Sequence, residues 1–398
     1  MDFDLPEEMQ SLRESVRRFH ETEIAPALPD YEARGEFPRE IVRKLGEAGY
    51  FGAAFPEWLG GSEAGFLAVS VIAEELSRLA PELGYCMNMQ AMTCPYTIYN
   101  WGSDSQAEAH VPDLISGRSI GMFALSEAGG GSDPAGAMRT TARRTGDGYL
   151  LNGSKMWITF SDAADTGVLF AKTDPEAEHR GISAFIVRPK DYPGYHADPI
   201  PMSGLSQALR SCAVFLEDFP VPEENRLGAE GEGFRIAMNA LEYGRLTVSA
   251  RLVGLAQAAL DAAVSYANER VVGGQAIAHY QMLQERIADS VVAVDAARMM
   301  ARQIGWTMDQ GRTSTRVASR AKYLATKAAR LAGDTAREVF GGYALSDEYP
   351  VKKLNAYIDM LTVGEGTENV QRVLIAQDVL GIKDANRHSL RNRLRNQT

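Results

Sequence analysis

Three separated segments decide how this chain is interpreted: FALSEAGGGSD (Phe123–Asp133), LNGSKMWIT (Leu151–Thr159) and VGEGTENVQ (Val363–Gln371). The first two supply hydroxyl groups, backbone amides and an indole in a region rich in turn residues. The third places Glu365 between two glycines, an unusual setting for a helix-forming residue, so the backbone there must turn or approach a ligand closely. The segments make chemical sense only together, and they predict one binding site that includes the carboxylate of Glu365.

In the residues before the first segment, apolar side chains recur at the spacing typical of amphipathic helices. Near the N-terminus apolar side chains step by three or four positions, and Pro6 suits the first turn of such a helix. The apolar residues of this stripe are Leu5, Met9, Leu12, Val16 and Phe19. A second helix is expected after Pro38 and a third over 66–79. Residues 1–118 are therefore predicted to form an N-terminal helical domain.

The pattern changes from residue 119 onward. Glycine clusters, the turn TGDGY (Thr145–Tyr149) and short apolar runs such as GVLFAKT and ISAFIVRP predict strands bounded by turns over residues 119–232. From Glu242 the helical period returns, and long helices with short joins predict an antiparallel four-helix bundle over residues 233–398. The expected fold class is α+β, with a β-barrel or β-sandwich domain between two helical domains.

Composition narrows the classes of function. A chain of 398 residues exceeds what one hydrophobic core usually serves, which agrees with several packed domains. The net charge of -11 argues against a nucleic-acid partner, which requires a basic face. No run of about 18 apolar residues occurs, and the N-terminus lacks the features of a signal peptide, so a cytoplasmic protein without membrane association is expected. Neither the cysteines nor the histidines occur at metal-ligand spacing, and no metal site is expected.

The three segments resemble the motifs of the acyl-CoA dehydrogenase family, which read close to ALTEPxAGSD, LNGxKxWITN and IYEGTxxIQ. They occur in the same order and at similar spacing, and the similarity runs over almost the whole chain. The resemblance implies the three-domain fold of that family, FAD as cofactor and an acyl thioester as substrate. The implied reaction takes the α-proton to a base and the β-hydride to the flavin, since no amino-acid side chain accepts a hydride.

In the family the glutamate of the third motif is the general base, which the resemblance places at Glu365. The thioester oxygen is held by the backbone N–H of this residue and by a ribityl hydroxyl of the flavin, which stabilises the charge formed as the proton leaves. Exclusion of water by the substrate is expected to raise the pKa of the acid. Some members carry the base at the position of Gly244, so a small residue there agrees with an acid at 365. The competing interpretation is an exposed loop glutamate.

The first two segments are implied to hold the flavin. Ser132 would lie near the pyrophosphate or the thioester arm, Trp157 over the ring face and Thr159 near N5. The implied flavin-binding residues in these segments are Phe123, Leu125, Ser126, Ser132, Trp157 and Thr159. Taken without the other segments, the glycine-rich run would indicate a flexible loop and Trp157 a core residue.

The resemblance assigns the second half of the FAD site to a neighbouring subunit. Arg270 matches an arginine that contacts the pyrophosphate, and Gln281 matches a nearby glutamine. The loop EVFGGYAL (Glu338–Leu345) and residues shortly after the base match groups at the adenosine end. The residues implied for this half are Arg270, Gln281, Glu338, Gly342, Thr367 and Asn369. An obligate homo-oligomer follows, with a dimer of dimers expected.

Several positions depart from the family pattern. Gly273 replaces a phenylalanine, and Ala356 and Tyr357 replace a common Arg-Asp pair. Glu338 replaces a glutamine, and an acid suits a pyrophosphate only if it faces away or pairs with Arg270. These changes bear on the substrate class and on the affinity for the cofactor more than on the reaction.

The substrate-binding residues implied by the resemblance are Ser132, Tyr243, Arg245, Gly364 and Gly366. Arg245 matches an arginine beside the carrier arm, although an exposed helix arginine is an equally good interpretation. Gly364 replaces a tyrosine that walls the acyl pocket. Together with Gly244 it predicts a wide pocket for a branched, cyclic or functionalised acyl group, unless a neighbouring side chain refills the space. Position 84, where glutaryl-type relatives carry a carboxylate-pairing arginine, is Gly84, which disfavours a dicarboxylic substrate.

Two other functions compete with this one. A flavin-dependent monooxygenase or oxidase on the same fold would keep the flavin segments but does not need Glu365. A non-catalytic helical scaffold would need neither the LNGSKMWIT segment nor the GEGT segment. Within the dehydrogenase interpretation, coenzyme A or a carrier protein bears the acyl group, and the direction is either oxidation or enoyl-thioester reduction. An electron-transfer flavoprotein is the expected electron acceptor.

Overall fold

The N-terminal region is helical, and the computed structural model describes residues 4–312 and 314–382 of the chain. The helices predicted at the N-terminus, after Pro38 and over 66–79 are confirmed. The first begins directly after Pro6, with two glutamates in its first turn, where they complement the helix dipole. A π-helical turn, Met87–Met92, follows a very short helix. The helices of this region are α1 (Glu7–Phe19), α2 (Leu28–Arg34), α3 (Arg39–Glu47), α4 (Gly65–Leu79), α5 (Gly84–Cys86), α6 (Pro95–Trp101) and α7 (Asp104–Ile115).

A β region follows, and its pairing connects strands that are distant in sequence. The strands are β1 (Gly121–Ala124), β2 (Thr141–Arg144), β3 (Gly148–Thr159), β4 (Thr166–Lys172), β5 (Ile182–Val187), β6 (Tyr195–Pro199), β7 (Ser211–Pro222) and β8 (Arg226–Leu227), with the short helix α8 (Pro134–Ala137) between the first two. Their order is β6-β7-β3-β2-β4-β5-β8, and β1 pairs parallel with β4. Within the described residues β6 and β8 are edges, so the sheet is open rather than closed into a barrel.

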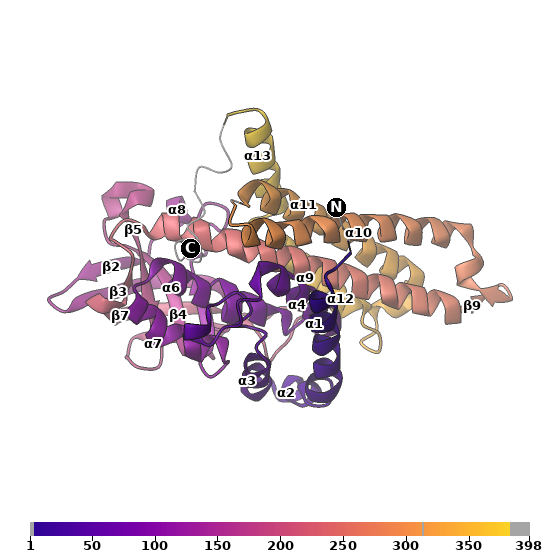
Figure 1. The fold of residues 1–398 in the computed structure, drawn as a ribbon, viewed down its shortest axis with the longest axis horizontal. Helices are drawn as coiled ribbons and strands as arrows, with labels where there is room; N and C mark the ends of the chain where they lie inside the picture. Colours follow the sequence, from indigo (N-terminus) through magenta and orange to yellow (C-terminus); the bar gives the residue numbers. More distant parts are fainter. Residues whose placement is uncertain (1–3, 313, 383–398) are drawn as a thin grey trace.

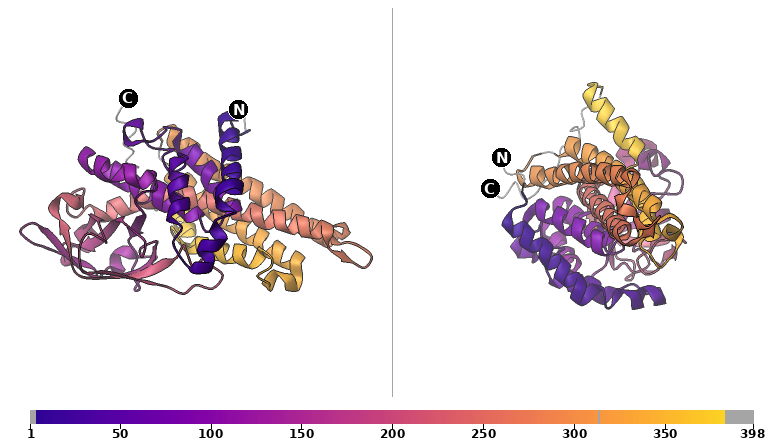
Figure 2. Two further views of the ribbon diagram at one scale, coloured as in Figure 1. Left: turned by 90° about the horizontal axis from the view of Figure 1, so that it is seen from below. Right: turned by 90° about the vertical axis from the view of Figure 1, so that its right-hand side faces the viewer.

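Long helices form the C-terminal region, as predicted. They are α9 (Gly233–Glu269), α10 (Gln281–Asp309), α11 (Thr315–Phe340), α12 (Val351–Val363) and α13 (Glu368–Val379). Figures 1 and 2 show α9 to α12 lying side by side as a bundle, while α13 projects from it. A hairpin of β9 (Val271–Val272) and β10 (Gln275–Ala276) joins α9 to α10 at the end far from the sheet (Figure 1). None of the described helices combines the length and apolar character needed to cross a bilayer.

Helix α9 connects all three regions and is buried over most of its length. Its start lies by the sheet and its end by the β9–β10 hairpin, and α4 of the N-terminal region packs along it (Figure 1). Arg245 and Arg251 are both buried on this helix, at 7% and 1% exposure. Buried arginines are rare unless they are paired or functional, so the middle of α9 marks a site.

Candidate active site

Glu365 lies in the short loop between α12 and α13. Its φ angle is 56°, in the left-handed region that a non-glycine residue seldom adopts and that often marks a functional site. Lys322 on α11 fixes the loop, because its Nζ donates to the carbonyl oxygens of Thr362 at 3.0 Å and Gly366 at 2.7 Å. Lys322 therefore stabilises the loop on both sides of Glu365, in a backbone conformation that glutamate rarely adopts.

The carboxylate of Glu365 points into the protein. Oε1 accepts a hydrogen bond from Nδ2 of Asn88 at 3.2 Å, while Oε2 is shielded from solvent and has no partner among the described residues. Burial raises the pKa of Glu365 to about 7, against the opposing effects of Arg245, Lys322 and Arg251. The residue as a whole is half-buried, but its carboxylate is not that of an exposed loop glutamate. A carboxyl group with this pKa and a free oxygen suits a general base near neutral pH.

Helix α9 supplies the surface opposite Glu365. A Cβ atom on Gly244 would lie 2.5 Å from Cδ of Glu365, so a larger residue there would force the carboxylate to move. Nε of Arg245 donates to the backbone oxygen of Glu365 at 3.4 Å. The alternative of an exposed helix arginine at this position is wrong, since Arg245 is buried.

Asn88 connects Glu365 to α9. It lies in the π-helical turn, a local irregularity that is frequent at functional sites. Besides donating to Glu365, its Oδ1 accepts from Oγ1 of Thr247 at 2.8 Å and from Nη1 of Arg251 at 3.0 Å. Sequence reasoning missed Asn88, Arg251 and Lys322. Of these three residues only Arg251 could have been found from the sequence. Gly244, Thr247 and Arg251 lie at i, i+3 and i+7, which places them on one face of a helix.

A β-bulge presents the indole of Trp157. The pairing of β3 with β7 shifts register between Lys155 and Ile158, and Trp157 between them has a φ angle of 65°. Its side chain is 54% exposed, so the interpretation as a core tryptophan is wrong. Thr159 ends the same strand, with its Oγ1 3.3 Å from Oγ of Ser211. An exposed aromatic face beside a hydroxyl suits a planar ligand.

The start of the glycine-rich segment is anchored to β3. Nζ of Lys155 and Oε1 of Glu127 form a buried ion pair at 2.8 Å, and Nζ also donates to the carbonyl oxygen of Leu125 at 3.3 Å. The backbone N–H of Met156 donates to the carbonyl oxygen of Ser126 at 2.9 Å. This part of the segment is therefore not a flexible loop, and the ion pair was not anticipated from the sequence.

The remaining residues of the first segment lie around this anchor. Phe123 on β1 packs edge-on against Phe170, with ring centroids 5.1 Å apart. Ser132 is exposed just before α8. The structure thus collects Phe123, Leu125, Ser126 and Trp157 in the β region, with Ser132 at its surface.

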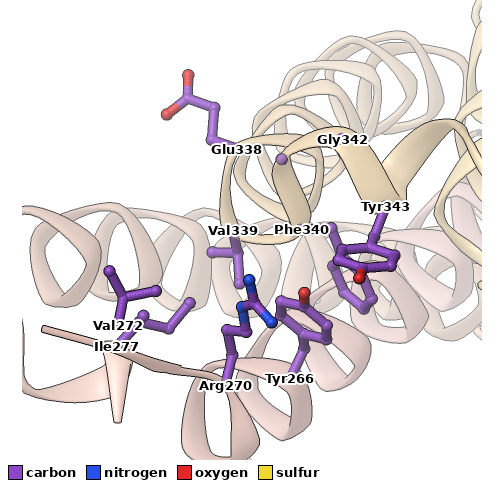
Figure 3. Close-up of a pocket in the computed structure, with 10 residues that line it drawn as sticks. Tyr266, Arg270, Val272, Ile277, Glu338, Val339, Phe340, Gly342 and Tyr343 are labelled. Atoms are coloured by element: carbon purple, nitrogen blue, oxygen red, sulfur yellow. The ribbon is translucent and has the colours of Figure 1, made fainter. Parts of the chain in front are cut away.

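A separate cavity of about 480 Å³ lies beside the β9–β10 hairpin (Figure 3), which is at the far end of the bundle from the sheet (Figure 1). Arg270, Glu338 and Gly342 line it, as do aromatic residues including Tyr266 and Tyr343. Figure 3 shows Arg270 next to Tyr266, with Glu338 pointing away from both. The acid instead pairs with Arg286, whose Nε lies 2.6 Å from Oε2 of Glu338.

Three further residues assigned to this half of the site lie outside that cavity. Gln281 is exposed at the start of α10. Thr367 caps α13, where its hydroxyl accepts from the backbone N–H of Val370, and Asn369 accepts from Nη1 of Arg372. Thr367 and Asn369 therefore lie close to Glu365 in sequence and in space, whereas Arg270 directly precedes β9 and lines the separate cavity.

Besides Ser132, the predicted substrate residues divide into two groups. Arg245, Gly364 and Gly366 contact or flank Glu365. Tyr243 instead packs in an aromatic cluster, stacked on Phe66 with ring centroids 5.7 Å apart. The structure does not bring Tyr243 to Glu365, and its contact with substrate stays a prediction.

Comparison with known proteins decides the family. The family models for the acyl-CoA dehydrogenase N-terminal, middle and C-terminal domains match residues 6–118, 122–219 and 231–380. The chain belongs to the acyl-CoA dehydrogenase family. Among curated acyl-CoA dehydrogenases, the glutaryl-CoA dehydrogenase of Desulfococcus multivorans is 39% identical over 97% of this chain and 100% of its own length. The human mitochondrial short-chain specific enzyme is 36% identical over 95% of this chain and 91% of its own.

Solved structures of acyl-CoA dehydrogenases share the whole fold. A glutaryl-CoA dehydrogenase in complex with glutaryl-CoA superposes with a TM-score of 0.93, at 39% identity, over 97% of this chain and 98% of that one. FAD or its reduced form is present in other related structures. The chain is accordingly an FAD-dependent oxidoreductase, and the predicted fold class, activity and cofactor are confirmed.

The residues present fit an acyl-CoA dehydrogenase site for FAD. The exposed indole of Trp157 and the hydroxyl of Thr159 offer an uncovered face in the β region. The unpartnered Oε2 of Glu365 faces inward on the side of α9. When bound, FAD supplies the acceptor of the β-hydride, for which the protein itself has no equivalent.

Proposed function

We propose that Glu365 is the base that removes the α-proton of an acyl thioester in this dehydrogenation. The observation that carries this role is its buried carboxylate, with one oxygen hydrogen-bonded to Asn88 and the other free. A proton accepted at Oε2 would relieve the cost of a buried charge, which is why burial raises the pKa to about 7.

We assign the stabilisation of the developing negative charge to the groups around the loop. The backbone N–H of Glu365 would hold the thioester oxygen, together with a hydroxyl of the cofactor. Arg245 and Lys322 add positive charge close by, and both are buried, where electrostatic effects are strong. Oxidation of the thioester is the direction we propose. Reduction of an enoyl thioester at the same site is the reverse reaction and the alternative.

We infer that the two halves of the FAD site meet between subunits. Trp157 is on β3 in the sheet, whereas Arg270 directly precedes β9 at the opposite end of the molecule (Figure 1). A partner in a homo-oligomer would therefore supply the second half of the FAD site. Arg270 and Gly342 line one cavity, and the ion pair of Glu338 with Arg286 reduces the cost of an acid near a pyrophosphate. A dimer of dimers in the cytoplasm is the assembly we propose.

The acyl group, its carrier and the electron acceptor complete the proposal. Relatives are named for glutaryl-CoA and for short-chain acyl-CoA, so their names do not decide between a functionalised and a simple acyl group. We assign coenzyme A as the carrier, with an acyl-carrier protein as the alternative, and an electron-transfer flavoprotein as the acceptor. One related structure carries the name of an electron transferring flavoprotein, that of Acidaminococcus fermentans.

Anaerobic titration of the purified holoenzyme tests the proposal. A panel of acyl-CoAs and acyl-carrier thioesters is added while the flavin absorbance is followed. Bleaching by a saturated acyl-CoA, with slow reoxidation in air and fast reoxidation by electron-transfer flavoprotein, is the expected result. Rapid air oxidation would instead support the oxidase or monooxygenase alternative. A lack of bleaching by every thioester would overturn the proposed reaction.

A further inference from the structure

Arg251 is a buried cation that the proposed reaction does not use. Its side chain is 1% exposed in the middle of α9. The described residues offer it no carboxylate partner within ion-pair distance, and its Nε and Nη2 are buried without a hydrogen-bond partner. Nη1 donates to Oδ1 of Asn88 at 3.0 Å. A buried charge without its counterion is costly, so a ligand that supplies the missing anion is expected.

The neighbours of Arg251 hold the guanidinium in place but do not neutralise it. Its Cζ lies 4.4 Å from the ring centroid of Tyr85, a cation–π contact. The Tyr85 hydroxyl is close to the guanidinium but accepts no hydrogen bond from Nε or Nη2. Burial raises the pKa of Tyr85 to about 12 despite Arg251, so the phenol stays neutral. Burial likewise raises the pKa of Cys86 to about 12, so that thiol supplies no anion.

The nearest acid is Glu365, and one amide group separates it from Arg251. Asn88 donates to Oε1 of Glu365 and accepts from Nη1 of Arg251, so both groups lie on the same small site. Arg251 is about two turns of α9 beyond Gly244, on the same face. Glu365 does not pair directly with the guanidinium, and Oε1 and Nη1 lie within roughly 8 Å of each other, since a single amide spans both hydrogen bonds.

Gly84 makes room for this arginine. A Cβ atom there would lie 3.0 Å from Nε of Arg251 and 2.2 Å from Oγ of Ser77, so a larger residue would displace one of them. Position 84 therefore carries no arginine, but the small glycine leaves room for the guanidinium of Arg251 from α9. Gly84 was expected to disfavour a dicarboxylic substrate because it carries no charge. Arg251, however, places a guanidinium beside this position from α9.

We propose that Arg251 binds the free carboxylate of a short dicarboxylic acyl group while the thioester end of the same molecule meets Glu365. The carboxylate pairs with Nε and Nη2, the two nitrogens that the protein leaves unsatisfied, in the bidentate geometry that a guanidinium favours. The short distance between base and guanidinium limits the acyl group to a few carbons. This proposal rests on the dehydrogenation proposed above and adds its substrate class.

Three thioesters of equal chain length test the proposal. They are glutaryl-CoA with a terminal carboxylate, 5-hydroxypentanoyl-CoA with a neutral acceptor and pentanoyl-CoA with neither. Their dissociation constants are measured by flavin absorption in the unreactive Glu365→Gln background, and their kcat/KM values with Glu365 present. Wild-type Arg251 is compared with Arg251→Gln and Arg251→Lys, and Arg43→Gln, a surface arginine on α3, is the control.

Glutaryl-CoA is expected to bind at least about 30-fold more tightly than pentanoyl-CoA with Arg251 present, because a buried charge pair is lost when either partner is removed. Arg251→Gln should bring the two to near parity and Arg251→Lys should restore part of the difference, while Arg43→Gln changes nothing. Equal binding with Arg251, or an equal loss for all three thioesters in Arg251→Gln, would overturn the proposal. If no thioester bleaches the flavin, the dehydrogenase function fails, but the binding constants still decide the role of Arg251.

Discussion

Gly244 and Glu365 share one small space: a Cβ atom on Gly244 would lie 2.5 Å from both Cδ and Oε2 of Glu365. Real Cβ atoms do not approach other heavy atoms so closely, so a larger residue at 244 would require the Glu365 carboxylate to move. Gly244 lies on α9 and Glu365 in the loop between α12 and α13. The two positions approach one point from opposite sides.

Moving the acid across this space is the first prediction. Glu365→Gly should lose nearly all flavin reduction, and adding Gly244→Glu should restore it to roughly 10-fold above the single variant, since the carboxylate again reaches the reacting carbon. Stopped-flow reduction under anaerobic conditions measures both rates. Gly244→Glu alone crowds the site with two acids and is expected to be slow. A double variant no faster than Glu365→Gly would show that the positions do not serve the same carbon.

Removing the base in place is the second prediction. Glu365→Gln keeps the size of the side chain, so the fold and the flavin spectrum should persist. Flavin reduction by saturating substrate should fall by roughly 10²-fold or more, the scale of a lost general base. The same substitution at Glu47, an exposed residue that pairs with Arg43 on α3, is the control and should have no effect. A rate for Glu365→Gln close to that of wild type would place the base elsewhere.

The third prediction concerns pH. Glu365 accepts a proton only when it is ionised, and its pKa is about 7, so kcat/KM for flavin reduction should rise with pH and level off above neutrality. Lys322 lowers the pKa of Glu365, so Lys322→Gln should move this limb to higher pH. Lys327 on the same helix pairs with Glu368, and Lys327→Gln should leave the limb unchanged. An unshifted limb in Lys322→Gln would contradict the electrostatic coupling.

Much of the fold was predictable because its signals are local. The stripe of apolar residues along α1, the breaks at Pro6 and Pro38, and the glycine turns between strands each depend on a few neighbouring residues. The segment around Glu365 was equally local, since two glycines flank the acid. The open edges of the sheet were not predictable, because they depend on which distant strands pair.

The rest of the site depends on packing between distant elements. Asn88 from a π-helical turn, Lys322 from α11 and Arg251 from α9 converge only after the domains have packed. Tyr243 shows the opposite case: it is next to Gly244 in sequence but faces a different side of α9, where Phe66 stacks on it. Proximity in sequence therefore does not decide which residues lie beside Glu365.

Gly364 gives the fourth prediction. A Cβ atom at this position would meet only the carbonyl oxygen of Met360, at 4.0 Å, so there is room for a larger side chain. Gly364→Tyr should lower turnover of branched and alicyclic acyl-CoAs by roughly 10-fold relative to butanoyl-CoA, because the ring would fill the widened pocket. Val363→Tyr, at the exposed neighbour, is the matched control. If wild type prefers the straight chain and the tyrosine does not affect the bulky substrates, the pocket is not wide.

The last prediction tests whether FAD is bound between subunits. Trp157 is on β3 of the sheet and Glu365 lies against Gly244 in the first half of α9, whereas Arg270 follows the last residue of α9 and lines the cavity there. Arg270→Ala alone should bind FAD poorly, and Glu365→Gln alone should bind FAD without reducing it. The two variants are co-expressed with different affinity tags, and the mixed oligomers are purified.

If the FAD site is shared between subunits, this mixture should give a specific result. In each mixed dimer one site combines Glu365 of the first chain with Arg270 of the second, so it is intact, while the other site carries both substitutions. Pure mixed dimers should therefore recover about half of the wild-type flavin reduction and FAD content. A mixture of two differently tagged Arg270→Ala chains is the control and should recover nothing. If each chain holds its own FAD, every site in the mixed oligomer is damaged, and its activity will not exceed that of the separate variants.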